Sequence, residues 1–99
     1  MRCDEAIKKL KNHLPELQAR FGVAQLSVFG SVARNEAGPK SDVDILVEFS
    51  PEAHVGLFGF VRLQRRLGEI LGARVDLATP GALKRQLREQ VLKERVRAA

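Results

Sequence analysis

The stretch SDVDILVEF, residues 41–49, is the clearest guide to the fold. Apolar and polar residues alternate along it, which is the period of a β-strand with one buried face. Val43 and Ile45 fall on one face of this strand, while Asp42 and Asp44 fall on the opposite face. Two carboxylates about 4 Å apart repel by about 4 kcal/mol at an effective dielectric of about 20. The acidic pair is therefore costly for folding alone and indicates a cation-binding role.

A third carboxylate belongs with this pair. Asp76 is the only acid in a later strand-like run, residues 74–78, and its apolar neighbours place it on the solvent side of that strand. Each acid by itself is more often a solvated strand residue. Mg²⁺, however, binds one or two protein carboxylates together with phosphate oxygens of a substrate. Asp42, Asp44 and Asp76 together predict a catalytic site for two metal ions.

Gly30 and Ser31 supply a complementary feature, because they follow another strand-like run at residues 24–29. A Gly-Ser pair is usually only a turn. Glycine nevertheless lets backbone N–H groups approach an anion, and the start of a helix favours negative charge. If the strands at 24–29 and 42–49 are antiparallel, phosphates held at Gly30 and Ser31 would meet metal ions held by the acids.

The remaining elements follow from apolar periodicity. We expect helices over residues 4–21, 31–36, 57–71 and from Thr79-Pro80 to the C-terminal region, and strands over 24–29, 42–49 and 74–78. Asp4 is the expected N-cap of the first helix, and Pro15 allows either one kinked helix or two short ones. Leu83, Leu87 and Val91 mark the expected buried stripe of the last helix. Residues 1–99 are thus predicted to form one α+β domain, a small sheet of about three strands flanked by helices.

The composition is that of a soluble globular protein, with 44% hydrophobic and 29% charged residues among 99. The sequence contains neither an apolar run long enough to span a bilayer nor a secretory signal, so we expect no membrane association and a cytoplasmic location. The one cysteine, Cys3, excludes an intramolecular disulfide, and we expect it to be incidental at a frayed terminus.

A net charge of +5 is typical of proteins that bind nucleic acids, but the distribution of the charge along the chain does not favour that function. Residues 62–99 hold ten basic and four acidic residues, whereas residues 1–61 hold seven and eight. The excess lies on expected helices without interleaved aromatic residues. It therefore indicates solvated helix faces or a surface for an acidic partner, and we do not expect direct nucleic-acid binding.

Residues 29–34, FGSVAR, and residues 41–49 together strongly resemble the minimal nucleotidyltransferases (MNT) of the DNA polymerase beta-like superfamily. The similarity extends through LGARVDL at 71–77 and TPGAL at 79–83. The resemblance implies the polymerase beta-like nucleotidyltransferase fold, with a mixed sheet. It also implies an antitoxin paired with a HEPN-domain ribonuclease toxin, since the best understood members transfer AMP from ATP to a tyrosine of that toxin and so silence it.

The resemblance also implies roles for the three acids. Asp42 and Asp44 would bind both Mg²⁺ ions, and Asp76 would bind one of them. Asp76 would in addition assist deprotonation of the attacking hydroxyl.

The nucleotide would be held by the other motif residues. Gly30 and Ser31 would bind the β- and γ-phosphates of ATP, while Arg34 and Ser41 match the motif and are expected to contribute to nucleotide binding. Asn35 stands where the family often has glycine, and asparagine also tolerates positive φ.

Three hypotheses follow. The first is a Mg²⁺-dependent protein adenylyltransferase that modifies a hydroxyl, foremost that of a tyrosine, on a HEPN-type ribonuclease toxin. The second is a non-catalytic antitoxin that neutralises the toxin by binding alone, and the third is a nucleic-acid-binding module. The three clustered acids favour the first, because binding alone does not require them.

Overall fold

The strand predicted from residues 41–49 lies inside the sheet. The computed structural model describes residues 1–38 and 41–98. The elements run in the order α1 (Cys3–Phe21), β1 (Val23–Phe29), α2 (Gly30–Ala33), β2 (Val43–Phe49), α3 (Leu57–Leu71), β3 (Val75–Ala78), the 3-10 turn η1 (Pro80–Ala82), α4 (Arg85–Glu94) and β4 (Val96–Arg97).

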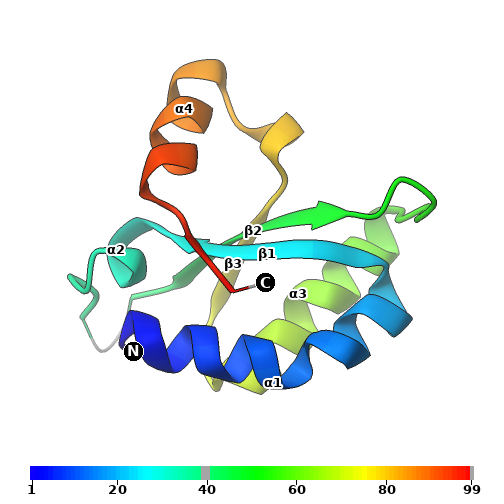
Figure 1. Ribbon diagram of the computed structural model, residues 1–99, viewed down its shortest axis with the longest axis horizontal. Helices are drawn as coiled ribbons and strands as arrows, with labels where there is room; N and C mark the ends of the chain where they lie inside the picture. The colour runs from blue at the N-terminus through cyan, green and yellow to red at the C-terminus, as the bar shows by residue number, and fades with distance from the viewer. Residues whose placement is uncertain (39–40, 99) are drawn as a thin grey trace.

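The sheet is mixed, with strand order β3-β2-β1-β4 (Figure 1). β1 is antiparallel to β2 and to β4, whereas β3 runs parallel to β2. The α+β class and the mixed sheet are confirmed. The sheet has one strand more than the three expected, because Val96 pairs with Val28 and the Ala98 amide donates to the Leu26 carbonyl at 2.8 Å.

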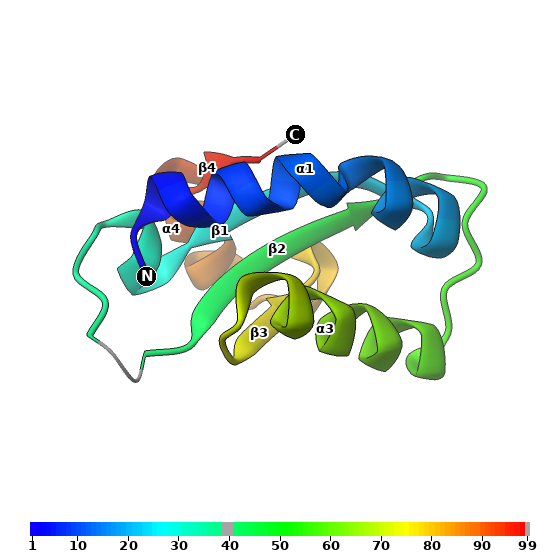
Figure 2. The same cartoon turned by 90° about the horizontal axis from the view of Figure 1, so that it is seen from below.

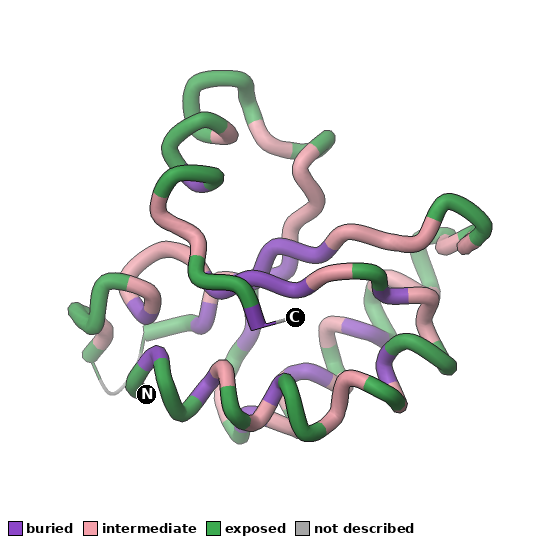
Figure 3. The backbone as a smooth tube through the Cα atoms, in the orientation of Figure 1, coloured by how far each residue is buried: buried purple, intermediate pink, exposed green. Residues whose placement is uncertain are grey.

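The helices divide between the two faces of the sheet. α1 and α3 lie side by side across one face, and α4 stands on the other (Figures 1 and 2). Buried residues of the sheet, of α1 and of α3 form the core, whereas α4 is mostly exposed (Figure 3). Val43, Ile45 and Val47 are buried as the alternation predicts. Asp44 lies on the opposite face of β2, which it shares with the buried Leu46.

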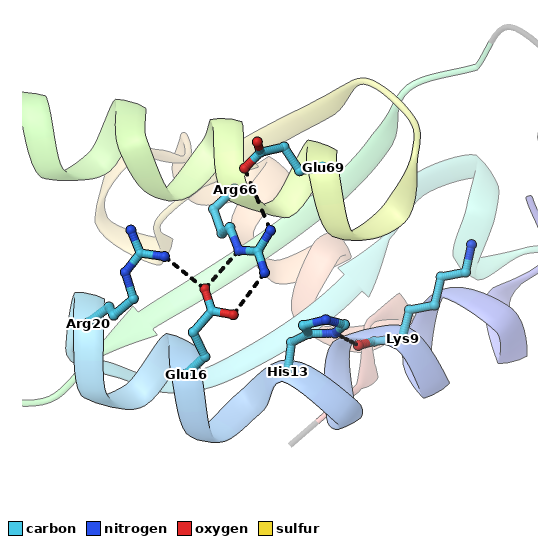
Figure 4. A network of polar contacts seen from close by, with 6 residues as sticks. All are labelled: Lys9, His13, Glu16, Arg20, Arg66 and Glu69. Atoms are coloured by element: carbon cyan, nitrogen blue, oxygen red, sulfur yellow. Dashed lines mark hydrogen bonds and ion pairs between the residues drawn. The ribbon is translucent and has the colours of Figure 1, made fainter.

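One polar contact joins α1 to α3 (Figure 4). The Arg66 guanidinium donates to both carboxylate oxygens of Glu16, with Nε–Oε2 2.7 Å and Nη2–Oε1 2.9 Å. Arg20 donates to the same carboxylate at 3.0 Å. These charge-assisted bonds lower the pKa of Glu16 to about 2, with the Arg66 hydrogen bond as the main cause. The pair thus ties together the two helices that cover the core.

The structure decides the alternative left open at Pro15 and corrects two expectations, for Asp4 and for Cys3. α1 is one helix with Pro15 inside it, and its first turn is capped from elsewhere in the chain. The Cys3 amide donates to Oδ1 of Asn35 at 3.0 Å, while Asp4 lies within the first turn as a helical residue. Cys3 is buried at the start of this helix, and not frayed. Asn35 does adopt positive φ, at 56°.

The last helix is shorter than predicted. After Thr79 the chain makes only the η1 turn, and Leu83 and Lys84 are extended before α4 begins at Arg85. Val91 is buried, but Leu87 is 48% exposed, so the expected stripe does not face the core throughout. Among residues 1–38 and 41–98, none of the helices is long and apolar enough to cross a membrane.

Candidate functional site

Strand pairing brings three of the predicted site residues into one row across the sheet. Phe29 pairs with Asp44 across the antiparallel β1–β2 ladder, so Gly30 follows immediately beside this acid. Asp44 in turn pairs with Asp76 across the parallel β2–β3 ladder. The order across the sheet is therefore Gly30, Asp44, Asp76. The antiparallel arrangement that joins the glycine turn to the acids is confirmed.

Gly30 is packed directly against Asp44. Its φ is 70°, a left-handed conformation that side chains rarely adopt. A Cβ built on Gly30 would stand 3.1 Å from Cγ of Asp44, and closer to its Oδ2. Glycine is required here twice over, by its φ and by the space that the carboxylate occupies. The bare backbone at the start of α2 is thereby held beside the central acid.

Asp44, the central acid of the row, has a perturbed pKa. Its pKa is raised, first by partial burial and then by the negative charges of Asp76 and Asp42. A hydrogen bond between the carboxyl groups of Asp44 and Asp76 adds to the increase, and the charge of Arg34 partly opposes it. Perturbed carboxyl groups of this kind are typical of sites that bind cations or move protons.

Asp42 lies at the outer end of the acidic group. Its side chain is 49% exposed, and its Oδ1 lies 3.9 Å from Nε of Arg74, which is itself 91% exposed. Such an exposed pair contributes little to stability. Arg74 thus lies beside Asp42.

The donor set suits a hard divalent cation, because every candidate ligand is a carboxylate oxygen. Within residues 1–38 and 41–98, however, no three His, Cys, Asp or Glu side chains are gathered tightly enough to hold a metal ion as they stand. Asp44 and Asp76 form the close pair, and the charge of Asp42 reaches Asp44 from one side. The mutual repulsion of these carboxylates is the energy that a bound cation would relieve.

The remaining motif residues are engaged in local contacts. Arg34 donates from Nε to Glu36 and from Nη1 to Glu94, both at 3.0 Å, and so ties the end of α2 to α4. The Ser41 hydroxyl accepts the Gly38 amide at 3.0 Å. Ser31 is partly buried in the first turn of α2, next to Gly30.

A groove of about 600 Å³ opens beside Asp42 and Asp76, at the outer edge of β3. Its other walls come from α3 and from the turn before β3. The lining residues are Asp42, Val61, Gln64, Arg65, Gly68, Ala73, Arg74, Val75 and Asp76. Gln64 and Arg65 were not predicted as site residues. Their only sequence signal is the polar face of an amphipathic helix, which does not reveal that this face borders an acidic strand edge.

Several basic residues of the C-terminal third are paired with acids. Arg66 binds Glu16, and Arg95 lies 3.4 Å from Glu48. Arg85 lies 4.0 Å from Glu89 on an exposed face of α4. These pairs agree with the interpretation of the positive excess as solvated or locally paired helix faces.

Comparisons with known proteins agree with the fold and the motif. Residues 7–98 match the family described as "Nucleotidyltransferase domain". The chain is 46% identical over 85 residues to the protein adenylyltransferase MntA of Thermococcus cleftensis, which covers 86% of this chain and 84% of the relative.

Solved structures give the same result. One described as a "putative minimal nucleotidyltransferase" superposes with a TM-score of 0.77 at 38% identity, covering 97% of this chain and 95% of that one. The MNT antitoxin complex with a tri-AMPylated HEPN toxin of Shewanella oneidensis superposes at 0.64, with 19% identity, covering 94% of this chain and 71% of that one. At that identity the second likeness concerns the fold alone.

Proposed function

The chain belongs to the nucleotidyltransferase domain family, and from that premise we propose that it transfers AMP from ATP to a hydroxyl of a HEPN-type ribonuclease toxin, foremost a tyrosine hydroxyl, and so acts as its antitoxin. The name of its relative MntA, at 46% identity, supports protein adenylylation. The fold shared with an MNT antitoxin bound to an AMPylated HEPN toxin supports the class of partner.

The observation that carries the proposal is the row Gly30, Asp44, Asp76. It places the bare backbone at the start of α2 next to two adjacent carboxylates, one of which has a raised pKa. Backbone amides suit the phosphates of ATP, and the carboxylates suit the cations that accompany them. A catalytically idle binding protein has no need of this costly arrangement.

In this proposal, Asp42, Asp44 and Asp76 hold two Mg²⁺ ions, and Gly30 and Ser31 hold the β- and γ-phosphates. The ions would neutralise charge on the phosphate oxygens and on the attacking hydroxyl. Arg34 and Ser41 border the nucleotide. To bind a phosphate directly, Arg34 must give up its hydrogen bond to Glu36 or to Glu94.

The transfer itself is a displacement at the α-phosphorus of ATP. The acceptor oxygen forms a bond to that phosphorus, the bond to the bridging oxygen of the β-phosphate breaks, and pyrophosphate leaves. The acceptor proton passes to the carboxylate of Asp76, which is exposed at the edge strand of the sheet.

Neutralisation by binding alone is the alternative to be excluded. The test compares wild type with Asp42→Ala/Asp44→Ala, each mixed with a purified HEPN-type toxin and Mg²⁺·ATP before its ribonuclease activity is measured. We expect the wild type to abolish that activity only when ATP is present, and the double variant to leave it intact. Equal, ATP-independent neutralisation by both proteins would establish binding as the mechanism.

A further inference from the structure

The groove at the outer edge of β3 lies on one side of the acids, and the glycine turn lies on the other. Asp76 lines the groove, whereas Gly30 packs against Asp44 on the neighbouring strand. Across the sheet the order is thus Gly30, Asp44, Asp76 and then the groove. The acids therefore lie between the glycine turn, which offers bare backbone, and the groove, which is lined by side chains.

This order determines where an acceptor can approach. In an in-line displacement, the attacking and leaving oxygens lie on opposite sides of the phosphorus. If the β- and γ-phosphates rest at Gly30 and Ser31, the pyrophosphate leaves on the β1 side of Asp44. The attacking oxygen must then come from the β3 side, where the groove opens beside Asp76.

The groove also carries its own charge. Arg65 and Arg74 line it, both exposed, together with the acids Asp42 and Asp76. Cations bound to the acids would cancel their negative charge and leave the two arginines as the excess. Gln64 is held in place by its donation to the Val75 carbonyl at 2.9 Å, which fixes the wall between α3 and β3.

The same helix face carries two exposed apolar side chains, Val61 within the groove and Leu57 just beyond it. Leu57, Val61, Gln64 and Gly68 recur at helical spacing along α3, so they share one face. Leu57 is 74% exposed and Val61 is 45% exposed, and Val61 also lines the groove. A segment of an acceptor protein could therefore contact apolar side chains and arginines of one helix while its hydroxyl reaches Asp76.

We propose that this groove is the acceptor site and that it selects a tyrosine-bearing segment with acidic flanking residues, the arginines Arg65 and Arg74 providing the selection. The inference rests on the proposed function, because it takes the nucleotide to lie at Gly30 and Ser31. It adds the class of acceptor and the residues that recognise it, which are positioning residues and not catalytic ones.

The test is an NMR titration of the full ¹⁵N-labelled chain. Mg²⁺·AMP-PNP is added first, and the peptides EEYEE and KKYKK are then added to separate samples. We expect AMP-PNP to shift the amide signals of Gly30 and Ser31, and EEYEE to shift those of Gln64, Gly68 and Ala73. We expect KKYKK to bind at least about tenfold more weakly than EEYEE.

Charge-reversal variants identify the selecting residues. Arg65→Glu/Arg74→Glu should lose at least about tenfold in affinity for EEYEE while retaining the AMP-PNP shifts. Arg62→Glu is the matched control, because Arg62 is an exposed arginine of the same helix that does not line the groove. It should bind EEYEE as the wild type does.

The outcomes separate the two proposals. Absence of AMP-PNP shifts at Gly30 and Ser31 would contradict the proposed nucleotide site. Normal AMP-PNP shifts without groove shifts from EEYEE at millimolar concentration would overturn the acceptor groove alone. Equal binding of both peptides, or equal weakening by Arg62→Glu, would overturn the role of the two arginines.

Discussion

Gly30 leaves the space that the carboxylate of Asp44 fills, since a Cβ on this glycine would lie 3.1 Å from Cγ of the aspartate. The two residues belong to different motifs in the sequence, and the β1–β2 pairing makes them neighbours. Stability and nucleotide binding should therefore respond together when this contact is disturbed.

Gly30→Ala tests that coupling against Gly72→Ala. Both glycines have positive φ, 70° and 65°, but a Cβ on Gly72 would meet nothing within 4 Å. Gly72→Ala should cost about 1–2 kcal/mol of unfolding free energy from its backbone conformation alone. Gly30→Ala should cost more and should also lose the rise in melting temperature caused by Mg²⁺·ATP. Urea unfolding and thermal melts measure both effects, and an unchanged nucleotide response in Gly30→Ala would refute the coupling.

Asp44→Asn should stabilise the metal-free protein at pH 7. Because the folded-state pKa of Asp44 is raised above 3.8, ionisation of this group disfavours the fold. The penalty is absent well below pH 3.8, where the carboxyl group is protonated in both states, and it grows as pH rises through the folded-state pKa. The urea midpoint of the variant should exceed that of wild type at pH 7 and match it near pH 3, and Mg²⁺ should no longer stabilise the variant.

Asp42→Asn is the matched control for this measurement. Its exposed contact with Arg74 contributes little, and its removal relieves some repulsion with Asp44, so the metal-free protein should be as stable as wild type or slightly more so. A large loss of metal-free stability in either variant would make that acid a structural residue.

The Glu16–Arg66 pair should give the fold an acid-sensitive component. The pKa of Glu16 is lowered from 4.5 to about 2, so its contribution is complete above pH 4.5 and is lost as pH falls towards 2. Glu16→Gln should therefore flatten the dependence of unfolding free energy on pH over that window. Glu69→Gln is the control, because Glu69 is exposed and lies 3.7 Å from Arg66. Parallel pH curves for wild type and Glu16→Gln would show that the pair does not act in this way.

Arg34 connects the end of α2 to α4, and this contact can be separated from its proposed contact with the nucleotide. Arg34→Ala should weaken Mg²⁺·ATP binding about tenfold or more, the value of a charge-assisted phosphate contact. Glu94→Gln removes only its partner on α4 and should bind ATP at least as tightly as wild type. Calorimetric titration measures both affinities. If Glu94→Gln weakens binding as much as Arg34→Ala does, Arg34 acts through the position of α4.

Strong local patterns predicted the central strand and the placement of its acids on the face opposite the core. The alternation of Val43, Ile45 and Val47 leaves one solution for burial, and that solution places Asp44 on the opposite face. The direction of β1 relative to β2 remained a condition at that point, because residues 30–42 connect the two strands and a connection of this length allows either direction. The structure makes the pairing antiparallel.

The features that were missed depend on tertiary contacts. β4 has only two residues and exists because β1 offers a free edge. Whether Pro15 divides the first helix was left open, and it stays within one helix because packing against the core outweighs one lost helical hydrogen bond. Asn35 caps α1 from 32 residues away. The groove at β3 likewise needs α3 and β3 together, and the residues of neither element alone indicate it.

The central claim is that this chain attaches AMP to a HEPN-type toxin by means of its acids. The most direct measurement is the intact mass of that toxin after incubation with the chain and Mg²⁺·ATP, with Asp44→Asn in parallel. The account predicts a mass increase of one or more AMP units with wild type, located at a tyrosine by peptide sequencing, and none with the variant. An unmodified toxin with wild type, or equal modification by both proteins, would contradict it.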